Sequence, residues 1–396
     1  LEVGVVFAAA AIAGGVADRL GQSVIPFYIL VGMGLGEFTL GRMGLPYVTE
    51  SSVVVVGAEL GIVFLLFFLG LEFNLDRLLA RRAQITRAGT IDFLVNFGAG
   101  LLLGWIVFGT VIPAVLLAGI VYISSSAVIT KSLIDLGWIA NDEAEPILGT
   151  LVFEDLLIAV YLAVMTAVVL GSDGLEAIAI DVGIALGFIL ALLIASRIGT
   201  EWIQHVVSTD SHEFLVLRAL GVTVSVAGVA LSIGVSEAVA AFFVGMAFST
   251  IDYEDLERLE RLLEPLRDAF AAIFFVWNGL VTDPLALGGV VGLIALAVFF
   301  TTPTKLLSGY LGGRVFDLDR RRSTRVALGM TTRGEFSLIV ATVAISGAGA
   351  GTIAPALAET INAFAVGYVL VMATLGTTLM QYSGPIETFV VSRLRE

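Results

Sequence analysis

The sequence predicts an all-α protein that crosses a lipid bilayer many times. Of its 396 residues, 58% are hydrophobic and only 14% are charged, whereas about 25% of the residues in an ordinary soluble domain are charged. The mean hydropathy is +1.00, and a chain of this length in water needs a polar outer shell. The apolar residues lie in unbroken runs rather than in alternating segments of about ten residues, which favours membrane helices over a β-barrel.

Composition also excludes several classes of site and partner. Cys is absent, so disulfides and iron–sulfur clusters are excluded. The two His residues, His205 and His212, lie in one polar loop, which argues against a zinc site. The net charge of −14 argues against nucleic acid as a partner. We therefore expect no cofactor and no transition metal.

The apolar runs predict where the membrane helices lie. A helix needs about 20 apolar residues to cross the hydrocarbon core of a bilayer. An additional amphipathic helix is predicted on the cytoplasmic surface at residues 250–266. In chain order, the thirteen predicted spans are residues 2–20, 22–40, 52–73, 88–109, 113–134, 146–170, 174–196, 213–233, 235–249, 267–282, 286–311, 324–346 and 361–381.

The basic residues predict how these spans are oriented. Cytoplasmic loops are enriched in Lys and Arg. Most of the 21 Lys and Arg residues fall in the odd-numbered loops and the C-terminal tail, and Arg42 alone falls in an even-numbered loop. We therefore predict a multi-pass protein of the cell membrane with its N-terminus outside and its C-terminus in the cytoplasm. The chain ends soon after the last span, so we expect any cytoplasmic regulatory domain to be deleted or to be a separate subunit.

Polar side chains inside a span need a physical reason, because a charge at the bilayer centre costs about 2.5–3.5 kcal/mol even on the more lenient scales. In chain order, an early case is the fourth span, where Asp92 and Asn96 share one helix face. We interpret this pair as lining a water pathway.

The fifth span contains a run of hydroxyl side chains in its middle. Ser124, Ser125 and Ser126 are consecutive, and Thr130 follows one turn later. Hydroxyl oxygens can satisfy the backbone groups of an interrupted helix, and they are neutral ligands for a hard cation. We predict Ser124, Ser125 and Thr130 as cation ligands. Close packing of small residues between helices remains the alternative interpretation.

The sixth span contains two adjacent acids, Glu154 and Asp155. Successive positions on a helix lie about 100° apart, so the two side chains face one cavity but meet different partners. Lys305, inside the eleventh span, is the natural counter-charge. If Lys305 pairs with Glu154, Asp155 is left as the ion-binding carboxylate. The alternatives are a structural acid pair and a lysine that extends to the membrane interface.

The twelfth span contains Arg333, Gly334 and Glu335 in succession. This triplet predicts a helix that is interrupted at Gly334, with Arg333 and Glu335 in a structural and electrostatic role, capping the open ends or pairing with each other. The fifth and twelfth spans are seven apart in order, and an odd offset reverses the direction of crossing, as inverted repeats require. We therefore predict inverted repeats with two interrupted helices that cross near the bilayer midplane.

These motifs together resemble the monovalent cation:proton antiporters of the sodium/hydrogen exchanger superfamily, including its potassium efflux members. The resemblance implies thirteen helices, a homodimer and a core that slides against a dimerisation scaffold. It also implies that Asp155 carries the cation and protons in turn while Glu154 pairs with Lys305. The stretches that carry it are Glu59–Glu72, Ser124–Ala127, Phe153–Asp155, Glu237–Gly245, Phe274–Gly279, Lys305 and Arg333–Glu335.

The resemblance also suggests a division of the chain. Residues 1–86 are expected to hold scaffold helices, residues 87–170 the core helices of the ion site, and residues 171–249 a linker helix with the scaffold helices of the second repeat. After the amphipathic helix at 250–266, residues 267–381 are expected to complete the core and residues 382–396 to form a cytoplasmic tail.

The expected function is therefore antiport of K⁺ or Na⁺ against H⁺, by an elevator-type movement in which both ions compete for Asp155. Glu154 departs from the family, whose members usually have Asp, Asn or Gln before the second acid, so the cation and the charge stoichiometry stay open. A cation channel or a cation-coupled symporter is the alternative. An intramembrane enzyme is not expected, because the Gly-x-Gly-Asp motif of intramembrane aspartyl proteases is absent and both His residues lie in a loop.

Overall fold

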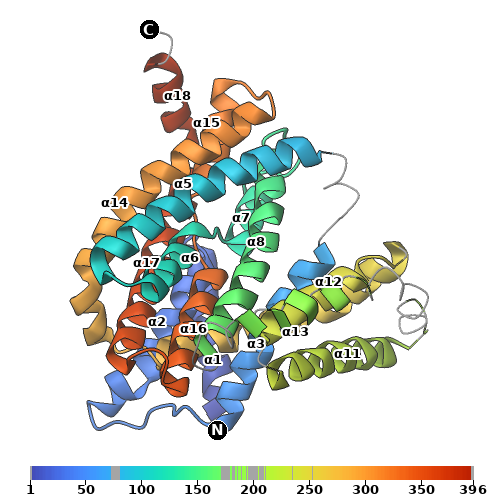
Figure 1. Cartoon of the computed structure of the whole chain (residues 1–396), viewed down its shortest axis with the longest axis vertical. Coiled ribbons are helices and arrows are strands. Elements are labelled where there is room, and N and C mark those ends of the chain that lie inside the picture. Colours follow the sequence, from blue (N-terminus) through green and yellow to red (C-terminus); the bar gives the residue numbers. More distant parts are fainter. Residues whose placement is uncertain are drawn as a thin grey trace.

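The computed structural model describes residues 2–72, 81–170, 211–233, 235–251 and 253–393, together with scattered positions between 179 and 209. Within these ranges every regular element is a helix (Figure 1). Seven of the helices in these ranges are long and apolar enough to cross a membrane. The prediction of an all-α, multi-pass membrane protein is thereby confirmed, while the total of thirteen spans and the inverted repeats stay predictions.

The first half of the chain follows the predicted spans closely. About half of the span predicted at 174–196 lies outside the described residues. The helices of this half are α1 (Glu2–Arg19), α2 (Val24–Leu35), the short π-helix η1 (Glu37–Gly41), α3 (Ser52–Glu72), α5 (Arg82–Phe108), α6 (Val111–Tyr122), α7 (Ser126–Asp135) and α8 (Ala144–Leu170).

The second half contains both long helices and short ones. The residues of the predicted tail form a helix of their own, α18. The helices of this half are α11 (His212–Ser232), α12 (Glu237–Phe248), α13 (Tyr253–Leu280), α14 (Pro284–Val315), α15 (Arg320–Gly329), α16 (Glu335–Ala350), α17 (Pro355–Gln381) and α18 (Ser383–Arg393).

Two of the predicted spans are interrupted in the structure, as their polar motifs indicate. The span predicted at 113–134 consists of α6 and α7 with residues 123–125 between them, and the span predicted at 324–346 consists of α15 and α16 with residues 330–334 between them. The side chain of Ser125 accepts a hydrogen bond from the backbone N–H of Val128 at 3.2 Å and so caps the start of α7.

The amphipathic helix predicted at 250–266 is not a separate element, and this prediction is corrected. Pro265 lies inside α13, which continues from a charged first half into an apolar second half. A proline removes a single helical hydrogen bond, and α13 packs against both α2 and α3. Packing on the neighbouring helices therefore outweighs the local helix-breaking effect of Pro265.

Close helix packing fixes one side of the molecule. α3 packs against α12 and α13, and α2 packs against α13. At the crossing of α3 and α12, Gly70 and Gly245 face each other, and a Cβ atom on either glycine would collide with the backbone of the other helix. Small residues that let helix backbones touch are the usual basis of helix association in lipid.

A second set of helices surrounds the two interruptions. α5 packs against α6, α8 and α14, α14 packs against α15 and α17, and α16 packs against α17 and α8 (Figure 1). These contacts gather α6, α7, α15 and α16 inside one bundle, which is where the polar residues of the fifth, sixth, eleventh and twelfth spans meet.

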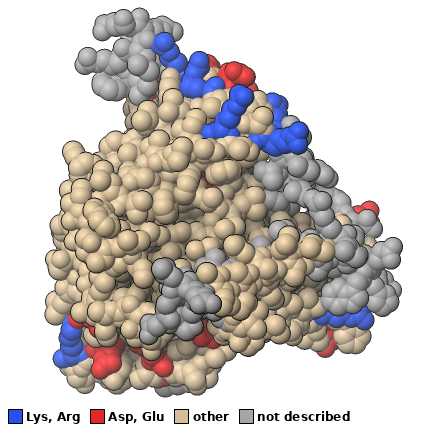
Figure 2. Space-filling model, in the orientation of Figure 1, with Lys and Arg blue, Asp and Glu red and all other residues tan. Residues whose placement is uncertain are grey.

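Charged side chains gather at the two ends of the molecule. The N-terminus and the C-terminus lie at opposite ends in Figure 1. Figure 2 shows Lys and Arg side chains concentrated at the end that holds α15 and α18, with a broad uncharged belt between this end and the other. The belt is the surface that lipid would cover, and the predicted orientation of the termini across the membrane stays a prediction.

We predict that Gly245→Ala destabilises the protein by about 1–3 kcal/mol, the usual cost of forcing extra atoms into a packed interface. The added Cβ would meet the backbone of Phe67, which has no side-chain freedom to give way. The matched control is Gly228→Ala on α11, where a Cβ meets nothing within 4 Å. Thermal unfolding midpoints in detergent compare the two variants, and equal midpoints would contradict the packing argument.

Candidate functional site

The two interrupted helices cross inside the second bundle. The backbone N–H of Ser125 donates to the carbonyl of Thr332 at 3.3 Å, which joins the two interruptions. A Cβ atom on Gly334 would collide with the side chain of Ser125, so this approach requires glycine at position 334. The C-terminal ends of α6 and α15 and the N-terminal ends of α7 and α16 therefore meet in one place. Such ends carry partial negative and partial positive charge, respectively.

Arg333 neutralises the two C-terminal ends. Its side chain is fully buried. Nε donates to the carbonyl of Val121 at 2.9 Å, at the end of α6. Nη1 lies within hydrogen-bond distance of the three carbonyls that follow α15, those of Met330 at 3.3 Å, Thr331 at 3.1 Å and Thr332 at 2.9 Å. This geometry fits the structural and electrostatic role that the sequence suggests for Arg333.

Glu335 is the first residue of α16, where a carboxylate interacts favourably with the N-terminal end of the helix. Its Oε2 accepts a hydrogen bond from the Ser125 hydroxyl at 2.6 Å. The Ser125 oxygen in turn accepts from the N–H of Val128. Glu335 and Ser125 therefore hold the crossing together, and both polar functions of the Ser125 hydroxyl are already engaged.

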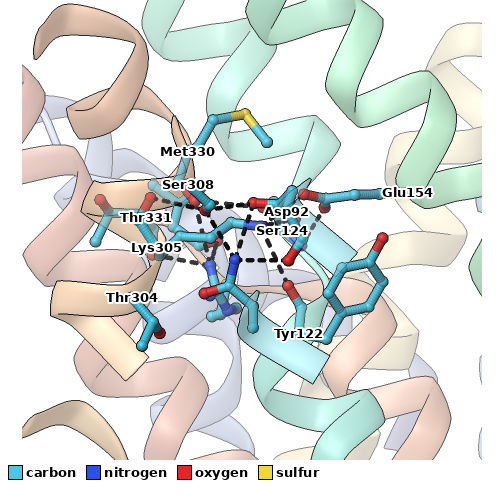
Figure 3. A network of polar contacts seen from close by, with 12 residues as sticks. Asp92, Tyr122, Ser124, Glu154, Thr304, Lys305, Ser308, Met330 and Thr331 are labelled. Carbon is cyan, nitrogen blue, oxygen red and sulfur yellow. Dashed lines mark hydrogen bonds and ion pairs between the residues drawn. The ribbon is translucent and has the colours of Figure 1, made fainter. Parts of the chain in front are cut away.

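Lys305 lies between two carboxylates at the centre of the bundle (Figure 3). Its Nζ is 2.6 Å from Oε1 of Glu154 and 2.7 Å from Oδ2 of Asp92, and the three side chains are between 0% and 2% exposed. Nζ also donates to the carbonyl of Tyr122, the last residue of α6, at 3.3 Å. The structure thus places Lys305 against Glu154, and its complete burial excludes the alternative of a lysine that reaches the membrane interface.

Glu154 also binds the first interruption directly. Its Oε2 accepts a hydrogen bond from the backbone N–H of Ser124 at 2.7 Å, and its Oε1 lies 3.1 Å from the Ser124 hydroxyl. That hydroxyl also lies 3.3 Å from the carbonyl of Met330, in the second interruption. Ser124, predicted as a cation ligand, is therefore placed as a bridge between Glu154 and the crossing.

Asp92 is the residue whose role the sequence analysis missed. The structure buries it to 1% exposure and makes it the second partner of Lys305, instead of leaving it on a water pathway. Its Oδ1 accepts hydrogen bonds from Asn96 Nδ2 at 2.9 Å and from the Ser308 hydroxyl at 2.7 Å. The sequence does show that Asp92 is an acid inside a predicted span and therefore needs a partner. No local pattern indicates that this partner, Lys305, lies 213 positions away.

Asp155 points to a different part of the crossing from Glu154. Its side chain is 3% exposed, and both of its carboxylate oxygens lie 3.2 Å from the hydroxyl of Ser126, the first residue of α7. Thr130, predicted as a ligand, lies one turn further along α7 and is half-buried. The structure therefore brings Ser126, rather than Thr130, to Asp155.

The site suits a monovalent cation or a proton better than a transition metal. Among the described residues, no group of three or more His, Cys, Asp or Glu side chains is placed to hold a metal ion. One buried carboxylate with a hydroxyl beside it, at the start of a helix, offers hard oxygen ligands and a single negative charge. Oxygen ligands of this kind are the ones that small hard cations prefer in proteins.

Comparisons with known proteins identify a family and related proteins. The family model described as "Sodium/hydrogen exchanger, transmembrane" matches residues 6–382. The chain is 36% identical over 385 residues to the K(+)/H(+) antiporter subunit KhtU of Bacillus subtilis (strain 168), covering 96% of this chain and 93% of that protein. It is 28% identical over 368 residues to the Ammonium/H(+) antiporter subunit AmhT of Alkalihalophilus pseudofirmus, covering 91% and 87%.

A solved structure has a similar fold. The sodium proton antiporter MjNhaP1 from Methanocaldococcus jannaschii at pH 8 matches with a TM-score of 0.76, over 98% of this chain and 97% of that chain. The two sequences are 17% identical in this comparison. At that level of identity, the likeness concerns the fold and not the individual residues of the site.

We predict that Arg333→Ala destabilises the protein by more than about 3 kcal/mol, because each buried carbonyl that loses its donor costs about 1–3 kcal/mol. The control is Arg322→Ala, since the Arg322 side chain is 45% exposed and an exposed ion pair contributes only about 0–1 kcal/mol. The midpoint of thermal unfolding in detergent is the measurement. Similar losses in both variants would show that Arg333 does not stabilise the crossing.

Proposed function

This chain belongs to the sodium/hydrogen exchanger family, and we propose that it exchanges K⁺ or Na⁺ for H⁺ by having the two ions compete for Asp155. The family model covers residues 6–382, which includes both interrupted helices and the buried acids. The single observation that carries the proposal is the placement of the adjacent acids: Glu154 contacts the buried ammonium of Lys305, whereas Asp155 is a buried carboxylate beside the hydroxyl of Ser126.

Burial makes the two ions exclusive at this carboxylate. A buried ionised carboxylate is costly even with hydrogen-bond donors beside it, and either a proton or a bound cation neutralises its charge. Asp155 is 3% exposed, and Ser126 supplies a neutral oxygen that can contact either ion. Binding a cation then expels the proton and binding a proton expels the cation, which is the coupling that antiport requires.

Alternating access completes the cycle. Because Asp155 is buried, ions reach it only when the surrounding helices shift. The bundle of α5–α8 and α14–α17 carries every residue of the site, whereas α2, α3, α12 and α13 pack mainly on one another and contact the bundle less, through α2 with α17 and α12 with α8. We propose that the first group moves against the second as an elevator, and that a homodimer holds the second group still in the membrane.

Monovalent cations of intermediate size are the first substrates to test. One relative is named a K(+)/H(+) antiporter subunit and another an Ammonium/H(+) antiporter subunit. The word "subunit" in both names also supports a separate regulatory subunit as a partner for this chain. A channel or a symporter remains the alternative function, because a buried acid at a helix crossing serves either of them as well.

We predict that Asp155→Asn abolishes exchange, because a neutral amide does not take up a proton when a cation leaves and has no negative charge to hold the cation. Proteoliposomes with an internal pH dye, challenged with K⁺ or Na⁺ gradients, measure the proton flux. The control is Asp135→Asn, since the Asp135 side chain is 58% exposed at the end of α7. Normal exchange in Asp155→Asn would refute the assignment, and cation flux that is independent of any proton gradient would identify a channel.

We predict that Ser126→Ala raises the cation KM several-fold while changing the maximal rate less, because a neutral hydrogen-bonding ligand contributes about 1 kcal/mol. Thr130→Ala is the matched control on the same helix. The measurement is the cation dependence of dye dequenching at fixed pH. A larger KM effect in Thr130→Ala than in Ser126→Ala would favour the ligand set that the sequence predicted over the one that the structure supports.

A further inference from the structure

Asp92 has no role in the exchange proposed above, yet it is as close to Lys305 as Glu154 is. Its Oδ2 lies 2.7 Å from Lys305 Nζ, against 2.6 Å for Oε1 of Glu154. Lys305 is therefore shared, and the two carboxylates that share it differ in how they are held.

The contacts of Asp92 come from two helices that pack along each other. Asn96 lies on α5, the helix that carries Asp92 itself, and Ser308 lies on α14, the helix that carries Lys305. Together with Lys305, these side chains give Asp92 hydrogen bonds on both of its oxygens. Each donor therefore stabilises the ionised carboxylate of Asp92 in one fixed position.

The contacts of Glu154 come instead from the interrupted helix. Apart from Lys305 and the carboxyl group of Asp92, its carboxylate contacts the backbone N–H and the hydroxyl of Ser124, which lies between α6 and α7. Glu154 is also the direct neighbour of Asp155 in the chain. It is thus the carboxylate of this cluster that lies closest to the proposed exchange site.

The charges of the cluster do not balance when all three groups are ionised. Two carboxylates against one ammonium leave one negative charge in excess, and a buried charge without a partner is costly. Tyr122, Asp155 and Arg333 are ionisable side chains near this cluster, and the guanidinium of Arg333 is engaged by backbone carbonyls. The cluster becomes neutral when one of its two carboxyl groups holds a proton.

We propose that Asp92 is a positioning residue that keeps Lys305 protonated throughout the cycle, so that Glu154 takes up and releases a second proton beside Asp155. The inference rests on the proposed antiport at Asp155. In the cation-loaded state, Asp155 holds the cation and Glu154 is ionised. In the proton-loaded state, Asp155 and Glu154 each hold a proton while Lys305 stays paired with Asp92. Two protons then cross for each cation, and each cycle moves one net charge.

Removing the charge of Asp92 tests this stoichiometry. In Asp92→Asn, Lys305 has only Glu154 as a charged partner, so Glu154 stays ionised and the exchange becomes one proton for one cation. Proteoliposomes on a solid-supported membrane report the transient current after a cation jump, and the pH dye reports proton exchange in the same preparation. We expect current from the wild-type protein, and continued exchange without current above that of protein-free liposomes from Asp92→Asn.

The matched control is Asp135→Asn, which makes the same substitution at a carboxylate that is 58% exposed, and which should leave the current per exchanged cation as in the wild type. Glu154→Gln is a second variant. Because Lys305 keeps Asp92 as its partner, we expect Glu154→Gln to remain monodisperse in gel filtration and to lose the current.

Each result separates this inference from the proposed function. A wild-type protein without any exchange would refute the antiport itself. Exchange without current in the wild type, or an unchanged current per exchanged cation in Asp92→Asn, would overturn the role of Asp92 alone. If Asp92→Asn does not fold, Glu154→Gln decides, and either its unfolding or its retained current would overturn the inference.

Discussion

The structure depends on neutralising charge where two interrupted helices cross inside an apolar bundle. Four helix ends meet there, and lipid offers no water to satisfy them. Arg333 covers the carbonyls that end α6 and α15, while Glu335 lies at the start of α16 and binds the cap of α7. Glu154 satisfies the free N–H of Ser124. These contacts fix the crossing, and the crossing in turn fixes where Asp155 lies.

Glu154 and Asp155 are adjacent on one helix and yet contact different groups. Glu154 and Asp155 share a backbone but differ by about 100° in direction, so they meet different environments at nearly the same depth. Glu154 meets Lys305, and Asp155 meets the first hydroxyl of α7. A shift of one residue along α8 would move one acid into the environment of the other and turn the second acid about 100° further away. The contacts of each acid are therefore set by its position on the helix.

The sequence predicts the helices well because apolar runs and intramembrane charges are local signals. Polar residues in the middle of otherwise apolar spans predict the interruptions near Ser125 and Gly334. Because few charged residues lie inside the predicted spans, Lys305 is the natural partner to predict for Glu154. The continuity of α13 through Pro265 depends on packing against α2 and α3, which a local rule does not include. The bond between Asp92 and Lys305 likewise joins positions that are 213 residues apart. Choosing Ser126 over Thr130 requires the geometry of the first turn of α7.

The side-chain length of Glu154 explains why this chain has glutamate before Asp155. Its carboxylate reaches Lys305 on α14 and the N–H of Ser124 in the interruption at once, at 2.6 and 2.7 Å. An aspartate, shorter by one methylene, would have to give up one of these contacts or draw the helices together. A glutamine at position 154 would keep the shape of the side chain and lose its charge. Lys305 would then still have Asp92 as a charged partner. Asp92 is therefore the acid that would still contact Lys305 if the residue before Asp155 lost its charge.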